Sequence, residues 1–384
     1  MAKFLKGTFR KPVTFIKRPV AARSMQGLVS SGNVDDELWL LLEYYSEVQD
    51  VGLSFLKGRG IISAPQRRKI FKYFQAYVRQ AKSFYYAAKA LPPRSSSLLY
   101  FYCFENLARA ALAIYDPTSV NIKKWQHGLK TDAGNRDFRH ETVVTYAEGV
   151  FPKFYNWYFG AQMKPNSLNV STLMGYCTDI GYQYQLASIG SRQVLYSYSA
   201  VCSSGDQGKT SWALLGIPKA QSILKYPKSF KNFLSSFEEI DVPWQSYERI
   251  FEILALERSA LTFFQSTQEI PWIENSLNES AVRMQILKAF ENSFQINYFG
   301  NKFDFAISLP YTQRRQIRMD ETVAIYLVMF YLSNLVRYKP QYLEKLLSKK
   351  EAWLIDSFVR SCIVTFLRSI VSRTIDTDFV FSNR

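Results

Sequence analysis

The two histidines of the chain, His127 and His140, are the residues best suited to acid–base chemistry. An imidazole exchanges protons near neutral pH, so either histidine could serve as a general acid or base. Arg136 precedes His140 with three intervening residues, and a guanidinium there could bind a phosphate group beside the imidazole. These three residues are therefore the candidate catalytic residues, although no catalytic signature assigns roles to them.

A second polar group lies upstream, in a stretch at 97–115 that is apolar almost all round and is predicted to form a central helix. Glu105 and Arg109 are spaced i,i+4 there, and Asn106 adjoins them. Buried charges must pair or meet a ligand. The three residues are predicted to form either a satisfied core network or the floor of a site, and the partner one turn away favours the network.

The chain carries 48 lysines and arginines against 32 acidic residues, a net charge of +16. Such a field attracts nucleic acid, an acidic protein or an anionic membrane surface, and charge alone does not choose among them. Before Asp35 there are seven cations and no acid, with prolines and glycines that oppose a continuous helix. We expect a basic arm, extended or mobile, that either follows phosphates or is a solvated tail, with an Arg-rich, acid-poor organellar transit peptide as the third interpretation. Its cations are Lys3, Lys6, Arg10, Lys11, Lys17, Arg18 and Arg23.

Amphipathic helices are predicted over 35–55 and 63–91, the second ending at Pro92-Pro93. Arg68, Lys72 and Arg79 fall away from the apolar stripe of the second helix. A basic face beside aromatic residues is a combination that holds single-stranded nucleic acid. The alternative is an ordinary solvated face.

Four cysteines lie far apart without a CxxC pair, and with two histidines they make a poor set of zinc ligands. We expect no metal and no cofactor, and a reducing compartment such as the cytoplasm. The apolar run at 323–336 is too short to span a membrane, which needs about 20 residues. It is predicted to be a buried helix of the core.

The middle of the chain changes character after about residue 166. Strands are predicted at 194–202, 210–215, 294–299 and 303–309, the last two flanking a Gly300-Asn301 turn, with helices at 246–257 and 278–290 between them. Residues 205–210 end in the Gly-Lys-Thr of a phosphate loop, but strand-like residues follow, so a hairpin turn is favoured. Helices are predicted again over 320–338 and 352–374.

Several short motifs follow one another along the chain, and the resemblance given below rests on their order and spacing. They are Phe84-Tyr85-Tyr86, residues 98–102 followed by Asn106-Leu107, Asp116-Pro117, His127-Gly128-Leu129, Gly149-Val150-Phe151-Pro152, and the run 326–340 with Leu332-Ser333 and Arg337-Tyr338. In these motifs the chain resembles the bacterial YaaC-like family, mainly in its helical ends. The resemblance implies a bacterial cytoplasmic protein and brings no activity. It draws attention to His127, Gly128 and Arg337 without giving them a role.

We predict a predominantly α-helical α+β fold in which the N- and C-terminal helices pack together and a small antiparallel sheet is inserted between them. The expected divisions are a basic arm at 1–34, a helical domain at 35–165, a mixed insertion at 166–319 and C-terminal helices at 320–384.

The expected function is non-catalytic binding of a nucleic-acid backbone, RNA or DNA, or of an acidic protein, in a bacterial defence or nucleic-acid-processing assembly. One alternative is a metal-independent ribonuclease like those of the HEPN superfamily, although Arg136 and His140 are closer in sequence than that family's pattern requires. Another is a structural subunit of a larger complex.

Overall fold

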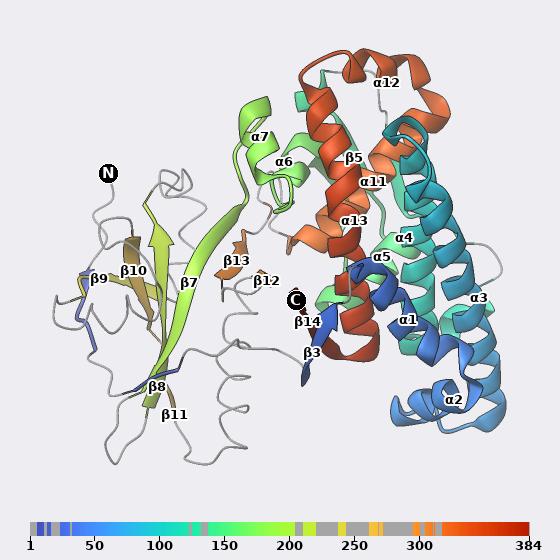
Figure 1. Ribbon diagram of the computed structural model, residues 1–384, viewed down its shortest axis with the longest axis horizontal. Coiled ribbons are helices and arrows are strands. Elements are labelled where there is room, and N and C mark those ends of the chain that lie inside the picture. The colour runs from blue at the N-terminus through green and yellow to red at the C-terminus, as the bar shows by residue number, and fades with distance from the viewer. Residues whose placement is uncertain are drawn as a thin grey trace. The chain divides into compact units, whose positions relative to one another are not determined.

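The computed structural model describes residues 6–10, 14–16, 24–30, 33–122, 125–131, 137–203, 210–219, 237–242, 261–267, 269–271, 295–299, 304–309, 311 and 317–383 (Figure 1). The chain forms two compact units. Unit 1 consists of residues 1–27, 191–312 and 316–320, and unit 2 consists of residues 28–190, 313–315 and 321–384.

Unit 2 is helical. Its helices are α1 (Val34–Glu47), α2 (Gln49–Gly58), α3 (Ala64–Lys89), α4 (Pro93–Tyr115), α5 (Val150–Phe159), α6 (Val170–Met174), α7 (Gly181–Ala187), α11 (Glu321–Tyr338), α12 (Pro340–Leu347) and α13 (Glu351–Ile375), with short 3-10 turns η1 (Pro117–Asn121) and η2 (Phe138–His140).

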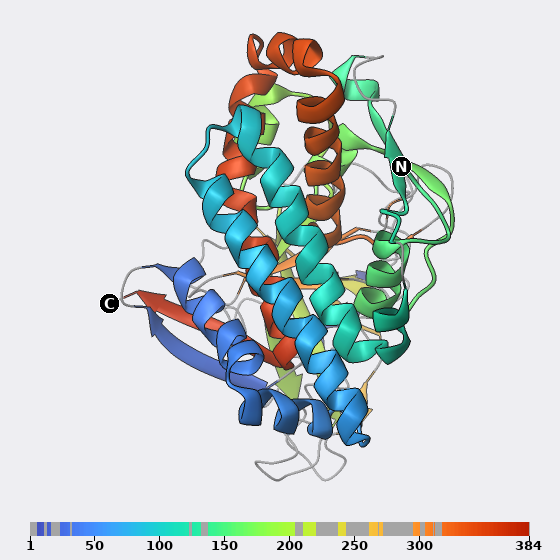
Figure 2. The same ribbon diagram turned by 90° about the vertical axis from the view of Figure 1, so that its right-hand side faces the viewer.

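Helices α3 and α4 lie side by side as a hairpin (Figure 2). Pro65 falls in the first turn of α3 and Pro93 in the first turn of α4, where a missing N–H breaks no helical hydrogen bond. The apolar stripe of α3, which includes Ile70 and Phe74, is buried. Almost every residue of α4 from 100 to 114 is buried. The charges that α4 carries must therefore be satisfied within the protein.

Helix α11 is the most deeply buried helix of unit 2, and all its residues from 321 to 333 are buried. Helices α4, α6, α12 and α13 pack around it. Phe104 of α4 stacks on Phe366 of α13 with ring centroids 3.8 Å apart, and Tyr326 of α11 stacks on Phe154 of α5 at 5.3 Å. The predicted packing of the N-terminal helices on the C-terminal helices is confirmed. In the described part of the chain, no helix is both long enough and apolar enough to cross a membrane.

A three-stranded antiparallel sheet completes unit 2, formed by β4 (Leu129–Thr131), β5 (Thr142–Thr145) and β6 (Asn166–Asn169). A separate two-stranded sheet joins β3 (Ser24–Ser30) and β14 (Thr377–Asn383). Because β6, α6 and α7 belong to unit 2, the helical unit continues to residue 190, beyond the boundary expected near 166.

Unit 1 is built on a nine-stranded sheet in the order β1-β9-β10-β8-β7-β13-β12, with β11 on β8 and β2 on β7. Its described pairs are antiparallel except β1 with β9. The strands are β1 (Lys6–Gly7), β2 (Thr14–Ile16), β7 (Val194–Ser203), β8 (Thr210–Pro218), β9 (Phe237–Ile240), β10 (Leu261–Ser266), β11 (Ile270–Pro271), β12 (Gln295–Phe299) and β13 (Asp304–Ser308).

Both predicted strand pairs occur, β7 with β8 and β12 with β13. Thr210 begins strand β8 rather than a helix, which argues against a phosphate loop because such a loop presents phosphate to a helix N-terminus. The Gly300-Asn301 turn, most of the Gly-Lys-Thr segment and the helices expected at 246–257 and 278–290 lie outside the described residues.

The α+β fold class is confirmed, with helix as the predominant regular structure of the described residues. One feature differs from expectation. The sheet of unit 1 is larger than predicted, partly because residues of the expected arm form β1 and β2 and pair with β9 and β7. Those arm segments are extended, as predicted, and are part of a sheet.

Candidate functional site

The carboxylate of Glu105 is the centre of a polar cluster in unit 2. Its Oε1 accepts hydrogen bonds from Nη2 of Arg109 at 2.8 Å and from Nδ1 of His127 at 2.9 Å. Burial acts to raise the pKa of Glu105, but the hydrogen bond from His127 and the charge of Arg109 outweigh it, so the pKa lies below its usual value. An ionised carboxylate can only accept hydrogen bonds, so Nδ1 of His127 carries the hydrogen.

The ring of His127 is held on three sides. Beside the Glu105 contact, it lies edge-on to Phe101 with centroids 5.5 Å apart and tilted against Phe330 at 6.2 Å. Its backbone carbonyl accepts a hydrogen bond from the N–H of Phe151 at 3.0 Å. The side chain is still 38% exposed, and among the described residues none bonds to its Nε2. A fixed imidazole with one nitrogen left without a partner in the described protein is the arrangement that acid–base chemistry needs.

Two glycines allow the His127 loop to dock on the start of α5. Gly128 has φ +74° and Gly149 has φ +127°, a region that side chains other than glycine rarely adopt. A Cβ on Gly149 would lie 2.5 Å from Cα of Gly128, and one on Gly128 would lie 2.5 Å from Cδ of Pro152. This close approach explains why the His127-Gly128 and Gly149-Val150-Phe151-Pro152 motifs occur together, because each glycine leaves room for the other segment.

Several buried polar atoms near this cluster have no hydrogen-bond partner within the described part of the chain. They are Oδ1 of Asn106, Nε of Arg109 and the hydroxyl of Tyr326. Burial raises the pKa of Tyr326, and the charges of Glu105 and Arg109 also act on it, which places its hydroxyl near the cluster. Asn106 donates to the carbonyl of Tyr102 at 2.8 Å, so only its oxygen is left over. Such atoms are uncommon in folded proteins.

On its other side the cluster continues into aromatic residues. The guanidinium of Arg109 lies 5.8 Å from the centre of the Trp125 ring. Burial raises the pKa of Tyr77, an effect opposed by the charge of Arg109 and by a hydrogen bond with Trp125. Tyr77 in turn lies 6.2 Å from Tyr73, its neighbour one turn earlier on α3. Sequence reasoning placed Tyr77 in the apolar stripe of the helix and did not single out Trp125.

His140 does not join this cluster. It is an exposed residue of the η2 turn, and no described residue connects it to His127 or to Glu105 by a hydrogen bond, ion pair or ring contact. Arg136, its predicted partner, lies outside the described residues. The structure therefore brings His127 together with Glu105 and Arg109, whereas Asn106 bonds to Tyr102 and His140 lies apart.

The cations of α3 fall into two groups. In the C-terminal half, Arg79 donates two hydrogen bonds to Glu47, at 2.9 and 2.6 Å, and Lys82 pairs with Glu43 at 2.5 Å. Lys89 pairs with the buried Asp35 at 2.7 Å. Three carboxylates of α1 thus neutralise this half of the helix, including Arg79, one of the predicted phosphate contacts.

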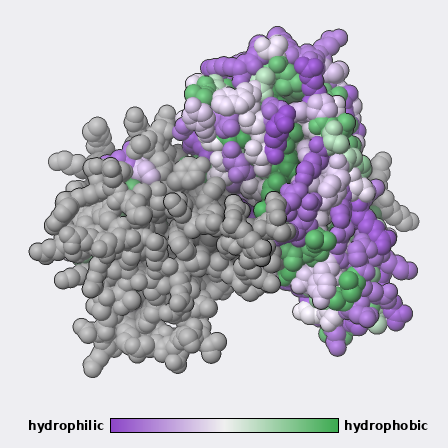
Figure 3. Space-filling model, viewed as in Figure 1, coloured by the Kyte–Doolittle hydropathy of each residue, from purple (hydrophilic) through white to green (hydrophobic). Residues whose placement is uncertain are grey.

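The N-terminal half of α3 keeps its charge. Arg67, Arg68, Lys69 and Lys72, together called the basic end of α3, have no carboxylate partner among the described residues. Arg67 donates to backbone carbonyls of residues 61 and 62, and Lys69 donates to Oδ1 of Asn121 at 2.7 Å. In Figure 3, hydrophilic side chains gather at the lower right of the described surface, over α2 and α3.

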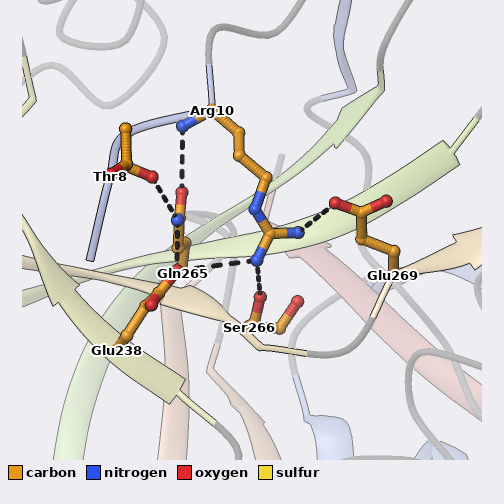
Figure 4. Close-up of polar contacts among 6 residues, drawn as sticks. All are labelled: Thr8, Arg10, Glu238, Gln265, Ser266 and Glu269. Carbon is orange, nitrogen blue, oxygen red and sulfur yellow. Dashed lines mark hydrogen bonds and ion pairs between the residues drawn. The ribbon is translucent and has the colours of Figure 1, made fainter.

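The remaining predicted phosphate contacts belong to the arm. Arg10 is engaged within unit 1: it donates to Oε1 of Glu269 at 2.7 Å and to the carbonyl of Ser266 at 2.8 Å, and lies 3.6 Å from Glu238 (Figure 4). The buried Gln265 side chain ties Arg10 to the same strand. Lys6 lies in β1, and Lys3, Lys11, Lys17, Arg18 and Arg23 lie outside the described residues.

A family model described as YaaC-like Protein matches residues 53–374. The chain belongs to the YaaC-like family. Neither the curated proteins nor the solved structures gave a match. The YaaC-like region contains α3, α4, the His127 loop and α11, and therefore the whole polar cluster. Arg337, in the last turn of α11, lies 5.8 Å above the Tyr102 ring, on the exposed side of α4.

One signal in the sequence would have identified the basic end of α3. Residues 51–104 contain ten lysines and arginines and no acidic residue. The positive charges of such a segment must be neutralised by acidic residues elsewhere in the chain or by a binding partner. In the structure α1 supplies them for one half of α3 only.

Proposed function

We propose that the protein binds the phosphate backbone of nucleic acid through the basic end of α3. The observation that supports this is the split of the α3 cations: three carboxylates of α1 neutralise one half, and the basic end has no carboxylate partner among the described residues. Lysine and arginine that face solvent without a counter-charge are the groups that displace condensed counterions from nucleic acid.

The position of these cations strengthens their field. They lie in the first three turns of α3, whose first turn contains no acidic residue. The partial positive charge of the helix N-terminus therefore adds to the charges of Arg68, Lys69 and Lys72. Lys57, in the last turn of α2, is also exposed and without a carboxylate partner in the described chain.

The proposed setting is the bacterial cytoplasm, where the protein would act within a defence or nucleic-acid-processing assembly. The described chain holds four free, buried cysteines, which supports a reducing compartment. An acidic protein is the competing partner for the same cations.

A triple variant of the basic end tests the proposal. Replacing Arg68, Lys69 and Lys72 with alanine is expected to weaken binding of a fluorescein-labelled oligonucleotide about 100-fold at about 0.1 M salt, because each lost phosphate contact costs about fivefold there. Fluorescence anisotropy measures the dissociation constants.

The matched control removes the same number of charges at positions that are already neutralised. Arg79 and Lys82 pair with acids of α1, and Arg94 lies 3.3 Å from Glu344. Replacing Arg79, Lys82 and Arg94 with alanine is expected to change affinity less than about threefold, since these cations have no free charge to offer. Equal losses in both triple variants would show that only net charge matters and would overturn the proposed site.

The fixed ring of His127 favours a second function, metal-independent cleavage of RNA. Nε2 would take the proton of a ribose 2′-hydroxyl, whose oxygen attacks the phosphorus as the bond to the 5′-oxygen breaks and that oxygen takes a proton from water. Arg109 binds the same oxygen of Glu105 as His127 does, so its guanidinium lies within about two hydrogen-bond lengths of the imidazole.

His127→Ala is then expected to reduce cleavage of an RNA oligonucleotide by at least about 100-fold, the usual contribution of a general base. His140→Ala serves as the control, because His140 lies apart from the cluster. Gel analysis of the products decides: cleavage that persists in His127→Ala, or that His140→Ala abolishes, removes this role from His127.

A further inference from the structure

We propose that the nucleic acid bound at the basic end of α3 is single-stranded, and that its bases stack along a stripe of aromatic residues beside α4. This inference rests on the proposed function and names the kind of nucleic acid. The aromatic residues of this stripe are Tyr73, Tyr77 and Phe84, and they share one face of α3 with Lys69 and Gln80 at spacings of three and four residues.

The stripe begins with a cation and continues with rings. Lys69 is one turn before Tyr73, which is 37% exposed, and Tyr77 follows with its ring centroid 6.2 Å from that of Tyr73. At its far end Phe84 lies 5.3 Å from Tyr102 of α4. From Lys69 to Phe84 the helix rises about 22 Å, enough for several nucleotides.

Cations lie over two rings that neighbour the stripe, those of Trp125 and Tyr102. Arg109 lies over Trp125 beside Tyr77, and Arg337 lies over Tyr102 beside Phe84. Arg337 also lies 5.0 Å from the ring of Tyr338, which is 63% exposed. Alternating rings and cations suit single-stranded nucleic acid, because its bases can stack on the rings while its phosphates pair with the cations.

Negative charge is nearly absent from this path. Helix α3 has no acidic residue, and the sole acid of α4 is Glu105, whose side chain is buried and shared between Arg109 and His127. The path is therefore complementary to a polyanion, and its rings give single strands an interaction that the stacked bases of a duplex cannot make.

The test compares one labelled oligothymidylate of about twelve nucleotides, single-stranded and annealed to its complement, at the same salt concentration. The single strand is expected to bind at least tenfold more tightly.

Tyr73→Ala is expected to weaken single-strand binding by about 5- to 100-fold, and Tyr73→Phe, which keeps the ring, is expected to bind like the unaltered protein. Tyr182→Ala, at an exposed tyrosine of α7, is the matched control and is expected to have no effect.

Equal affinity for the duplex, or unaltered binding by Tyr73→Ala, overturns the single-strand path. In either case the proposed function still stands if the Arg68, Lys69 and Lys72 variant loses affinity. Displacement of the oligonucleotide by polyglutamate at an equal concentration of charges would instead assign the surface to an acidic protein, and the inference would be wrong.

Discussion

Raising the pH from about 5 to about 9 is expected to lower the free energy of unfolding by on the order of 4 kcal/mol through one buried residue, Glu321 at the start of α11. Burial, and then the negative charge of Asp179, raise the pKa of Glu321 from 4.5 to about 8. The geometry agrees: Oγ1 of Thr178 lies 2.6 Å from both oxygens of the carboxyl group. A hydroxyl has one hydrogen to donate, so a proton on the carboxyl group satisfies the second contact.

The sign follows from proton binding. Between about pH 4.5 and about pH 8 the folded state keeps the proton of Glu321 and the unfolded state loses it, so stability falls as the pH rises and levels off above about 8. Glu321→Gln is expected to remove this part of the pH dependence in urea unfolding, since the amide stays neutral. Glu344→Gln, at an exposed carboxyl group of α12, is the control and is expected to leave it unchanged. A Glu321→Gln variant with the full loss of stability at high pH would contradict the assignment.

Glu105→Ala is expected to lower the free energy of unfolding by about 2 to 3 kcal/mol. The change leaves Arg109 and His127 without their shared acceptor, and breaking a buried charge pair costs more than the pair itself contributes. The side chains of Arg109 and His127 are partly exposed, at 21% and 38%, so water can reach them, and the expected loss is smaller than for a fully buried pair.

Asp356→Ala is the matched control for this change. Asp356 and Arg360 form another i,i+4 pair, on α13, and both side chains face solvent. Loss of this exposed ion pair is expected to lower the free energy of unfolding by less than about 0.5 kcal/mol. Urea unfolding of the two variants at neutral pH compares them, and equal small effects would mean that Glu105 is not the anchor of the polar cluster.

Local patterns in the sequence predicted much of the fold. The spacing of apolar residues located α3, the almost wholly apolar stretch at 97–115 located α4, and the short apolar run at 323–336 correctly indicated the core helix α11. The pairing of Glu105 with Arg109 was also predictable, because both partners lie on one helix turn.

Contacts between segments that are distant in the sequence could not be predicted from local sequence patterns. His127 reaches Glu105 because Gly128 and Gly149 let its loop pack on α5, which no spacing rule indicates. Arg10 pairs with Glu269 through the sheet of unit 1. Which cations of α3 are neutralised depends on how α1 packs against α3, so the difference between Arg79 and Lys72 could not be foreseen.

The salt dependence of oligonucleotide binding is the measurement that tests the central claim most directly. The logarithm of the affinity is expected to fall linearly with the logarithm of the salt concentration, and the slope is expected to be smaller by about 2 in the Arg68, Lys69 and Lys72 variant, since each single-strand phosphate contact contributes about 0.7. The control variant, in which Arg79, Lys82 and Arg94 are replaced with alanine, is expected to keep the slope of the unaltered protein. If the basic-end variant also keeps it, these cations do not contact phosphate and the account of the protein as a nucleic-acid-binding protein is wrong.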